Sequence, residues 1–149
     1  MINQNLKQEV WVVFTAQSEL PYLKYLKEGF RHCFVVMCDG QRWVSIDPLA
    51  HHTEIYVQDC AADFDLPAWL EAEGHVVVKT AIRQSIKPAP MMPFTCVEAV
   101  KRVLGIHKRR VLTPWQLYQY LSEEQYAEPQ NEDDLKDYKY MKGVWSWVA

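Results

Sequence analysis

Cys96 stands where a thiol has most to gain chemically, in the first turn of a predicted helix. The segment MPFTCVEAVKRVLG (92–105) carries Thr95 and Glu98 in the T-x-x-E pattern of a capping box, and Gly105 is suited to end the helix. Unpaired backbone N–H groups and the helix dipole favour a thiolate there, and those N–H groups can bind the oxyanion formed when a thiolate attacks a carbonyl. Cys96 is therefore a candidate nucleophile; the alternative is a small residue that fills the helix start.

A nucleophilic thiol needs a base, and the hairpin predicted around Asp39-Gly40 supplies a candidate. An Asp-Gly pair between two β-rich runs is typical of a two-residue turn. That turn sets His32 directly opposite Asp47, with their Cβ atoms about 5 Å apart. An imidazole beside a carboxylate is the arrangement of a general base and its orienting group. The alternative is a surface cross-strand pair, and a one-residue bulge would separate the two side chains.

The other histidines are weaker candidates. His51 and His52 follow a proline in a predicted loop and are interpreted as solvated, with a metal-binding role as the alternative. His75 begins a predicted strand and is interpreted as a core or rim residue. His107 lies in a basic cluster whose charges complement a helix C-terminus; an anionic substrate or partner is the alternative. The cluster also contains Lys101, Arg102, Lys108, Arg109 and Arg110. We expect no metal site and no cofactor.

Composition limits the class of protein. The chain has 149 residues, of which 49% are hydrophobic and 23% charged, as expected for one globular domain with a real core. The net charge of −3 argues against nucleic-acid binding, which needs a basic face. No apolar run approaches the length of a membrane span, and the first residues lack a signal-peptide pattern. We therefore expect a cytoplasmic protein, or one exported without a classical signal.

The cysteine pattern favours free thiols. The four cysteines contain no CxxC pair, so neither a disulfide framework nor a structural zinc site is expected. Besides Cys96, they are Cys33, Cys38 and Cys60. We interpret these three as reduced, buried small hydrophobic residues.

The elements that must position these groups follow from hydrophobic patterning. Strands are predicted at 10–16, on both sides of the Asp39-Gly40 turn, at 53–58 and at 75–82, the last so apolar that a central position is expected. Helices are predicted over 19–30, 65–74 and 95–105, with a further one beginning at Thr113-Pro114. The fold class is α+β, a mainly antiparallel sheet with helices packed against it.

Two segments complete the chain. The proline-rich stretch 85–93 is predicted to be an extended loop that leads into the Cys96 helix. It should form one wall of a substrate groove, with Met91, Met92 and Phe94 as an apolar lining; the alternative is burial against the core. Residues 1–121 are interpreted as a single domain, and 122–149 as an acidic, then aromatic, C-terminal tail.

With these residues identified, the chain resembles the NlpC/P60 branch of the papain-like superfamily in its circularly permuted form. The resemblance lies in chain order: His32 in RHCFVV, Asp47 in WVSID, then Cys96 in FTCVEAVKRVLGI. The segment LTPWQLYQYL is similar to the helix that follows the nucleophile helix in some bacterial and phage relatives. The chain departs from papain in lacking a clear counterpart of its oxyanion glutamine, so backbone N–H groups at Cys96 must do more of that work.

The resemblance implies a cysteine hydrolase. Cys96 would attack an amide or ester, with His32 as base and Asp47 as orienting group, on a peptide, peptidoglycan or acyl substrate. Acyltransferase or thioesterase activity is an alternative. So is a non-enzymatic papain-like module with a structural or interaction role, for instance in a phage particle, which would also change the expected localisation. The sequence does not predict an oligomeric state.

Overall fold

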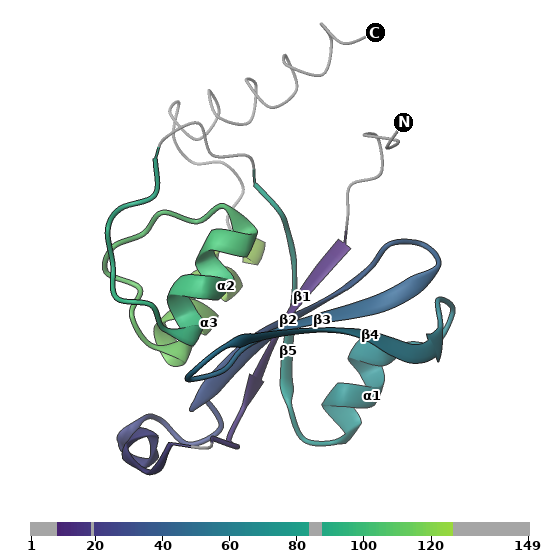
Figure 1. Ribbon diagram of the computed structural model, residues 1–149, viewed down its shortest axis with the longest axis horizontal. Coiled ribbons are helices and arrows are strands. Elements are labelled where there is room, and N and C mark those ends of the chain that lie inside the picture. The colour runs from purple at the N-terminus through teal and green to yellow at the C-terminus, as the bar shows by residue number, and fades with distance from the viewer. Residues whose placement is uncertain (1–8, 19, 84–87, 127–149) are drawn as a thin grey trace, which may run out of the picture.

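Five antiparallel strands form one sheet in the order β4-β3-β2-β1-β5 (Figure 1). The strands are β1 (Glu9–Thr15), β2 (His32–Cys38), β3 (Arg42–Pro48), β4 (Thr53–Ala61) and β5 (Val76–Ala81). The computed structural model describes residues 9–18, 20–83 and 88–126. Val and aromatic residues recur in β1 and β2, as expected for side chains that pack on a pleated surface.

Helices cover both faces of the sheet, so that it separates two cores (Figure 1). On one face lie α2 (Cys96–Leu104) and α3 (Pro114–Tyr126), and on the other lies the short α1 (Leu66–Ala72). The first core includes Phe14 and Val35 from the strands. The second includes Val36 and Trp43. The predicted α+β class with a mainly antiparallel sheet is confirmed.

The hairpin β2–β3 differs from the prediction in its register. Cys38 pairs with Trp43, and the Asp39 N–H donates to the Arg42 carbonyl, so Gly40 and Gln41 form the turn. The Asp39 carboxylate accepts from the backbone N–H groups of both Gln41 and Arg42, which draws the turn one residue further along the chain. The register therefore shifts by two residues. Because side chains alternate with period two, this shift leaves every residue on its predicted face.

The prediction that 75–82 forms a central strand is wrong, because β5 is an edge strand. Its apolar character has another cause: helices pack on both of its faces. Val78 belongs to the core beneath α2 and α3, whereas Val77 packs against the core on the α1 side. An edge strand that is covered on both faces has the same sequence signature as a central one.

The predicted helix over 19–30 is also wrong. Of the described residues there, only Pro21–Tyr25 form a helix, a 3-10 turn (η1) that buries none of its side chains. Its N-cap residue, Leu20, makes no side-chain capping bond, and Gly29 has a φ of 80° that ends any regular helix before Phe30. The leucines of this segment therefore do not form the buried face of a helix.

The last described helix, α3, begins as predicted. The Thr113 hydroxyl accepts from the Gln116 N–H, and the Gln116 side-chain oxygen accepts from the Thr113 N–H, a reciprocal capping box. The helix continues to Tyr126, five residues past Leu121, the expected end of the domain. The rest of the predicted tail lies outside the described residues. None of the helices in the described ranges is long and apolar enough to cross a membrane.

Candidate active site

Cys96 is the first residue of α2, as predicted, and the helix start is capped. The Thr95 hydroxyl accepts a hydrogen bond of 3.2 Å from the Glu98 N–H. The Glu98 side chain does not complete the capping box by returning to Thr95; it is buried and pairs with cations further along the helix. The free N–H groups of the first turn therefore lie beside the Cys96 thiol, where they favour a negative charge.

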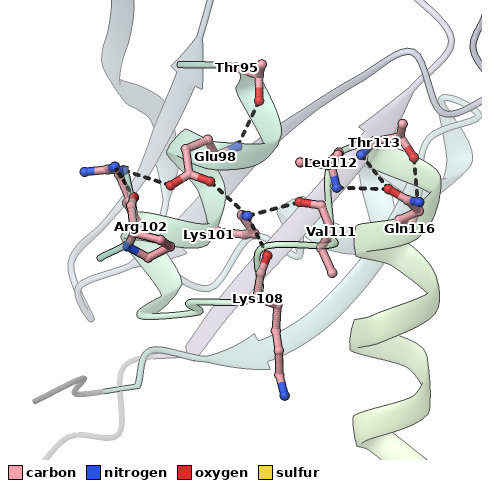
Figure 2. Close-up of polar contacts among 10 residues, drawn as sticks. Thr95, Glu98, Lys101, Arg102, Lys108, Val111, Leu112, Thr113 and Gln116 are labelled. Carbon is pink, nitrogen blue, oxygen red and sulfur yellow. Dashed lines mark hydrogen bonds and ion pairs between the residues drawn. The ribbon is translucent and has the colours of Figure 1, made fainter. Parts of the chain in front are cut away.

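A buried charge network holds α2 in place. Figure 2 shows the Lys101 ammonium between the Glu98 carboxylate at 2.8 Å and the backbone carbonyls of Lys108 and Val111 at 2.8 and 3.0 Å. The Arg102 guanidinium donates to the other carboxylate oxygen of Glu98 at 3.1 Å. Lys101 is almost fully buried, so each of these bonds is strong and its loss costly. This network fixes the helix that carries Cys96 to the segment that follows it.

His32 and Asp47 are in contact, as predicted. His32 Nε2 lies 2.6 Å from Asp47 Oδ1, and both side chains are partly buried. Continuing the observed register by one pair places Phe34 opposite Asp47, so His32 reaches Asp47 diagonally across the two strands. A carboxylate can only accept, so Nε2 carries the proton and Nδ1 is left for another partner.

Cys96 is the thiol on which His32 acts. His32, Asp47 and Cys96 line one cavity of about 700 Å³, and the imidazole and the thiol shift each other's pKa. The cavity lies at one end of the sheet, where Thr15 of β1 pairs with His32 of β2. Thr15 and His75, interpreted from the sequence as a core or rim residue, also line it. The three predicted catalytic residues are thus brought together from three elements.

The surroundings of Cys96 stabilise its thiolate. The largest effect is a hydrogen bond from the Cys33 thiol to the Cys96 sulfur; burial opposes it, and the bond and charge of His32 add to it. Together they lower the pKa of Cys96 from 9.0 to about 5. The backbone of Cys33 also contributes a hydrogen bond to the same sulfur. At neutral pH Cys96 is therefore a thiolate, the reactive form of the side chain.

His32 is correspondingly held as a cation. Burial by itself lowers the pKa of His32, but the hydrogen bonds to Asp47 and Cys96 and the charges of both outweigh it. The net result raises the pKa of His32 from 6.5 to about 9. Between about pH 5 and pH 9 the pair is a thiolate and an imidazolium. This pair supplies a charged nucleophile and a proton donor at the same place.

Cys33 is the site residue that the sequence analysis missed. It lies in β2 directly after His32, and adjacent strand residues point to opposite faces. Cys33 is fully buried in the core beneath α2, and burial raises its pKa well above the usual range, so it remains a proton donor to Cys96. No local sequence pattern marked Cys33, because its proximity to Cys96 depends on α2 packing onto the face of β2 that carries Cys33.

Two loops and the approach to α2 form the walls of the cavity. Phe94 lines it, as predicted, but Met91 and Met92 do not; Met91 is 98% exposed and projects into solvent. The apolar lining comes instead from the segment around η1 and from the loop after β3. The residues concerned are Leu20, Tyr22, Leu23, Pro48, Leu49 and Ala50. Among the described residues no lysine or arginine lines the cavity, so the His32 imidazolium is the positive charge that its described walls offer to a substrate.

The remaining sequence candidates lie elsewhere. His52 pairs with Glu54 on the surface, and the described residues contain no cluster of three or more potential ligands that could hold a metal ion. The basic cluster divides: Lys101 and Arg102 belong to the buried network, whereas Lys108 packs over the Tyr120 ring. Cys38 and Cys60 are free thiols, only partly buried, on the α1 side of the sheet.

No family model, no curated protein and no solved structure matches this chain.

Proposed function

We propose that the protein is a thiol-dependent hydrolase with a permuted papain-like arrangement, in which Cys96 is the nucleophile, His32 the acid and base, and Asp47 the orienting group. The observation that carries this proposal is the position of His32, which is hydrogen bonded to Asp47 and lines the same cavity as Cys96, the thiol whose pKa it helps to lower. The chain order His32, Asp47, Cys96 and the antiparallel sheet with the Cys96 helix against it agree with that arrangement.

The mechanism follows from the charges. The Cys96 thiolate attacks the carbonyl carbon of an amide or ester, and the carbonyl electrons move to its oxygen. Backbone N–H groups in the first turn of α2 bind the resulting oxyanion. The His32 imidazolium gives its Nδ1 proton to the leaving amine or alkoxide, and the C–N or C–O bond breaks to leave a thioester on Cys96.

Water completes the cycle. The neutral His32 takes a proton from a water molecule, whose oxygen attacks the thioester carbonyl and releases the acid, and Cys96 is restored as a thiolate. Asp47 holds the ring so that Nδ1 faces the sulfur throughout. If an amine or alcohol replaced water, the same steps would give acyl transfer, so the choice between the two activities depends on access to the thioester rather than on the catalytic groups.

The proposal is tested by trapping the thioester. Incubation with p-nitrophenyl acetate, followed by intact mass and peptide mapping, should place one acetyl group on Cys96, with a burst of nitrophenol equal to the protein present. Cys96→Ser should abolish the burst, and His32→Ala should slow both acylation and release. Cys38→Ser serves as the matched control, because this free thiol lies on the other face of the sheet.

Two results would contradict the proposal. Acetyl groups spread over several cysteines would show that Cys96 has no special reactivity. A reactive Cys96 whose acetyl group is never released, in water or to any amine, would favour the non-enzymatic module. That second result would agree with a low pKa of Cys96 and would contradict only the hydrolase activity.

A further inference from the structure

The edge strand β4 exposes three consecutive large apolar side chains. Ile55, Tyr56 and Val57 are 71%, 59% and 49% exposed, and among the strands that the structure describes β4 pairs only with β3. An edge strand presents a row of unpaired N–H and C=O groups, so apolar side chains on both of its faces make it a template for another strand. The sequence of β4, TEIYVQDCA, contains no proline, lysine or arginine, the residues that commonly protect such edges.

The opposite edge of the sheet is different. Helices α1 and α3 pack against β5, and the Gln125 side chain donates to the Lys79 carbonyl at 2.6 Å. Lys79 itself places a charge on that edge. Exposure of apolar residues is thus a property of β4 and not of the sheet edges in general.

The exposed residues extend an apolar surface that β3 begins. Ile55 lies opposite Ile46, and Val57 lies opposite Val44, on one face of the sheet. Tyr56 lies opposite Ser45 on the other face. A further strand beside β4 would therefore cover apolar side chains on one face and a tyrosine ring on the other, besides pairing the free backbone groups.

We propose that β4 pairs in antiparallel orientation with β4 of a second copy of this chain, around a twofold axis at Tyr56. A twofold axis perpendicular to the sheet keeps each face on its own side, so paired residue numbers must have an even sum. Centring on Tyr56 places Ile55 opposite Val57 twice and Tyr56 opposite itself. Centring on Val57 instead would place Ile55 opposite the Asp59 carboxylate.

Charge also fits this register. Glu54 lies opposite Gln58, and Thr53 lies opposite Asp59, so no carboxylate faces another across the new ladder. At each end of the new ladder, Glu54 of one copy and Asp59 of the other lie on opposite faces of the sheet. A second copy thus satisfies the backbone, the apolar residues and the charges of β4 together, and the two sheets become one continuous sheet.

Oligomeric state tests the proposal. Sedimentation velocity from about 1 to about 100 μM, a range that covers moderate affinities, should show a dimer. Val57→Lys should raise the concentration at which half of the protein is dimeric by at least tenfold. Trp69→Lys is the matched control, because Trp69 is also 49% exposed but lies on α1, and it should leave the dimer unchanged. A monomer throughout, or a dimer indifferent to Val57→Lys, overturns the proposal.

Cross-linking tests the register without any destabilising charge. Tyr56→Cys should form a disulfide between two copies under mild oxidation, and a mixture of ¹⁴N- and ¹⁵N-labelled protein identifies the bond as intermolecular. Thr53→Cys lies away from the twofold axis and should not link to itself. Linking by Thr53→Cys but not by Tyr56→Cys overturns the register. If the protein is monomeric and the β4 amides are nevertheless protected from hydrogen exchange, another segment of the same chain pairs with β4. That result also overturns the proposal.

Discussion

The Nε2 atom of His32 and the Oδ1 atom of Asp47 lie 2.6 Å apart, on neighbouring strands that one tight turn connects. The bond fixes the orientation of the ring and leaves Nδ1 for another partner. The proposed base and its orienting group therefore come from a single hairpin, whereas the proposed nucleophile comes from a helix packed against the sheet.

The first prediction concerns pH. Alkylation of Cys96 by iodoacetamide should rise as pH increases through about 5, where the thiolate forms, and any hydrolysis should fall again as His32 loses its proton near pH 9. The lowered pKa of a cysteine extends the reactive form to lower pH, and the raised pKa of a histidine extends the proton donor to higher pH. His32→Ala should move the alkylation midpoint upward. A midpoint that does not move would mean that the two side chains do not interact.

A second prediction concerns Cys33. Cys33→Ala removes the largest contribution to the low pKa of Cys96, so that pKa should rise and alkylation at pH 6 should slow several-fold. The substitution should lower stability by only about 1 kcal/mol, since little buried volume is lost. Cys60→Ala, which removes a free thiol on the other face of the sheet, should change neither the pKa of Cys96 nor its alkylation rate. The rates are compared by peptide mapping of alkylated Cys96; equal rates in Cys33→Ala and the native chain would exclude Cys33 from the site.

A third prediction concerns substrate chemistry. Because apolar side chains form much of the described lining of the cavity, N-alkyl iodoacetamides should label Cys96 faster as the alkyl chain lengthens, by up to about fourfold per CH₂. Leu20→Ser with Leu23→Ser should flatten this dependence while leaving the rate with iodoacetamide itself unchanged. Met91→Ser is the control, since Met91 does not line the cavity. A dependence that survives in the double variant would place the alkyl chain elsewhere.

A fourth prediction concerns Gly105, which ends α2 in the left-handed conformation with a φ of 69°. A Cβ atom there would lie 2.0 Å from the Arg83 carbonyl oxygen, so Gly105→Ala should cost about 3 kcal/mol or more. Gly74 also has positive φ, 91°, but open space around it, so Gly74→Ala should cost only about 1 kcal/mol. Urea denaturation measures both. Equal losses would show that backbone strain alone, and not the close approach to Arg83, sets the cost.

Local signals predicted the parts of the site that depend on a few neighbouring residues. Thr95 and Gly105 marked the ends of α2 because capping is a matter of backbone conformation within one turn. The pairing of His32 with Asp47 was reached through a turn placed one residue too early, and it survived because a two-residue shift preserves faces and long side chains reach diagonally.

Tertiary packing decided the features that the sequence could not predict. Periodicity cannot distinguish a central strand from an edge strand that is covered on both faces, so β5 was misplaced. Leucines at helical spacing around Pro21 line a cavity rather than a helix-packed core. Cys33 was overlooked for the same reason, because its contact with Cys96 exists only once α2 has packed onto β2.

The ionisation of Cys96 depends on β2, through His32 and Cys33, and on the first turn of α2. If α2 separates from the sheet, the sulfur loses all its partners from β2 at once and returns to an ordinary thiol. Its alkylation rate below pH 7 therefore reports the equilibrium between docked and undocked helix, without any engineered probe residue. The protein thus contains its own probe for local unfolding, which can be followed in dilute samples and in crude extracts.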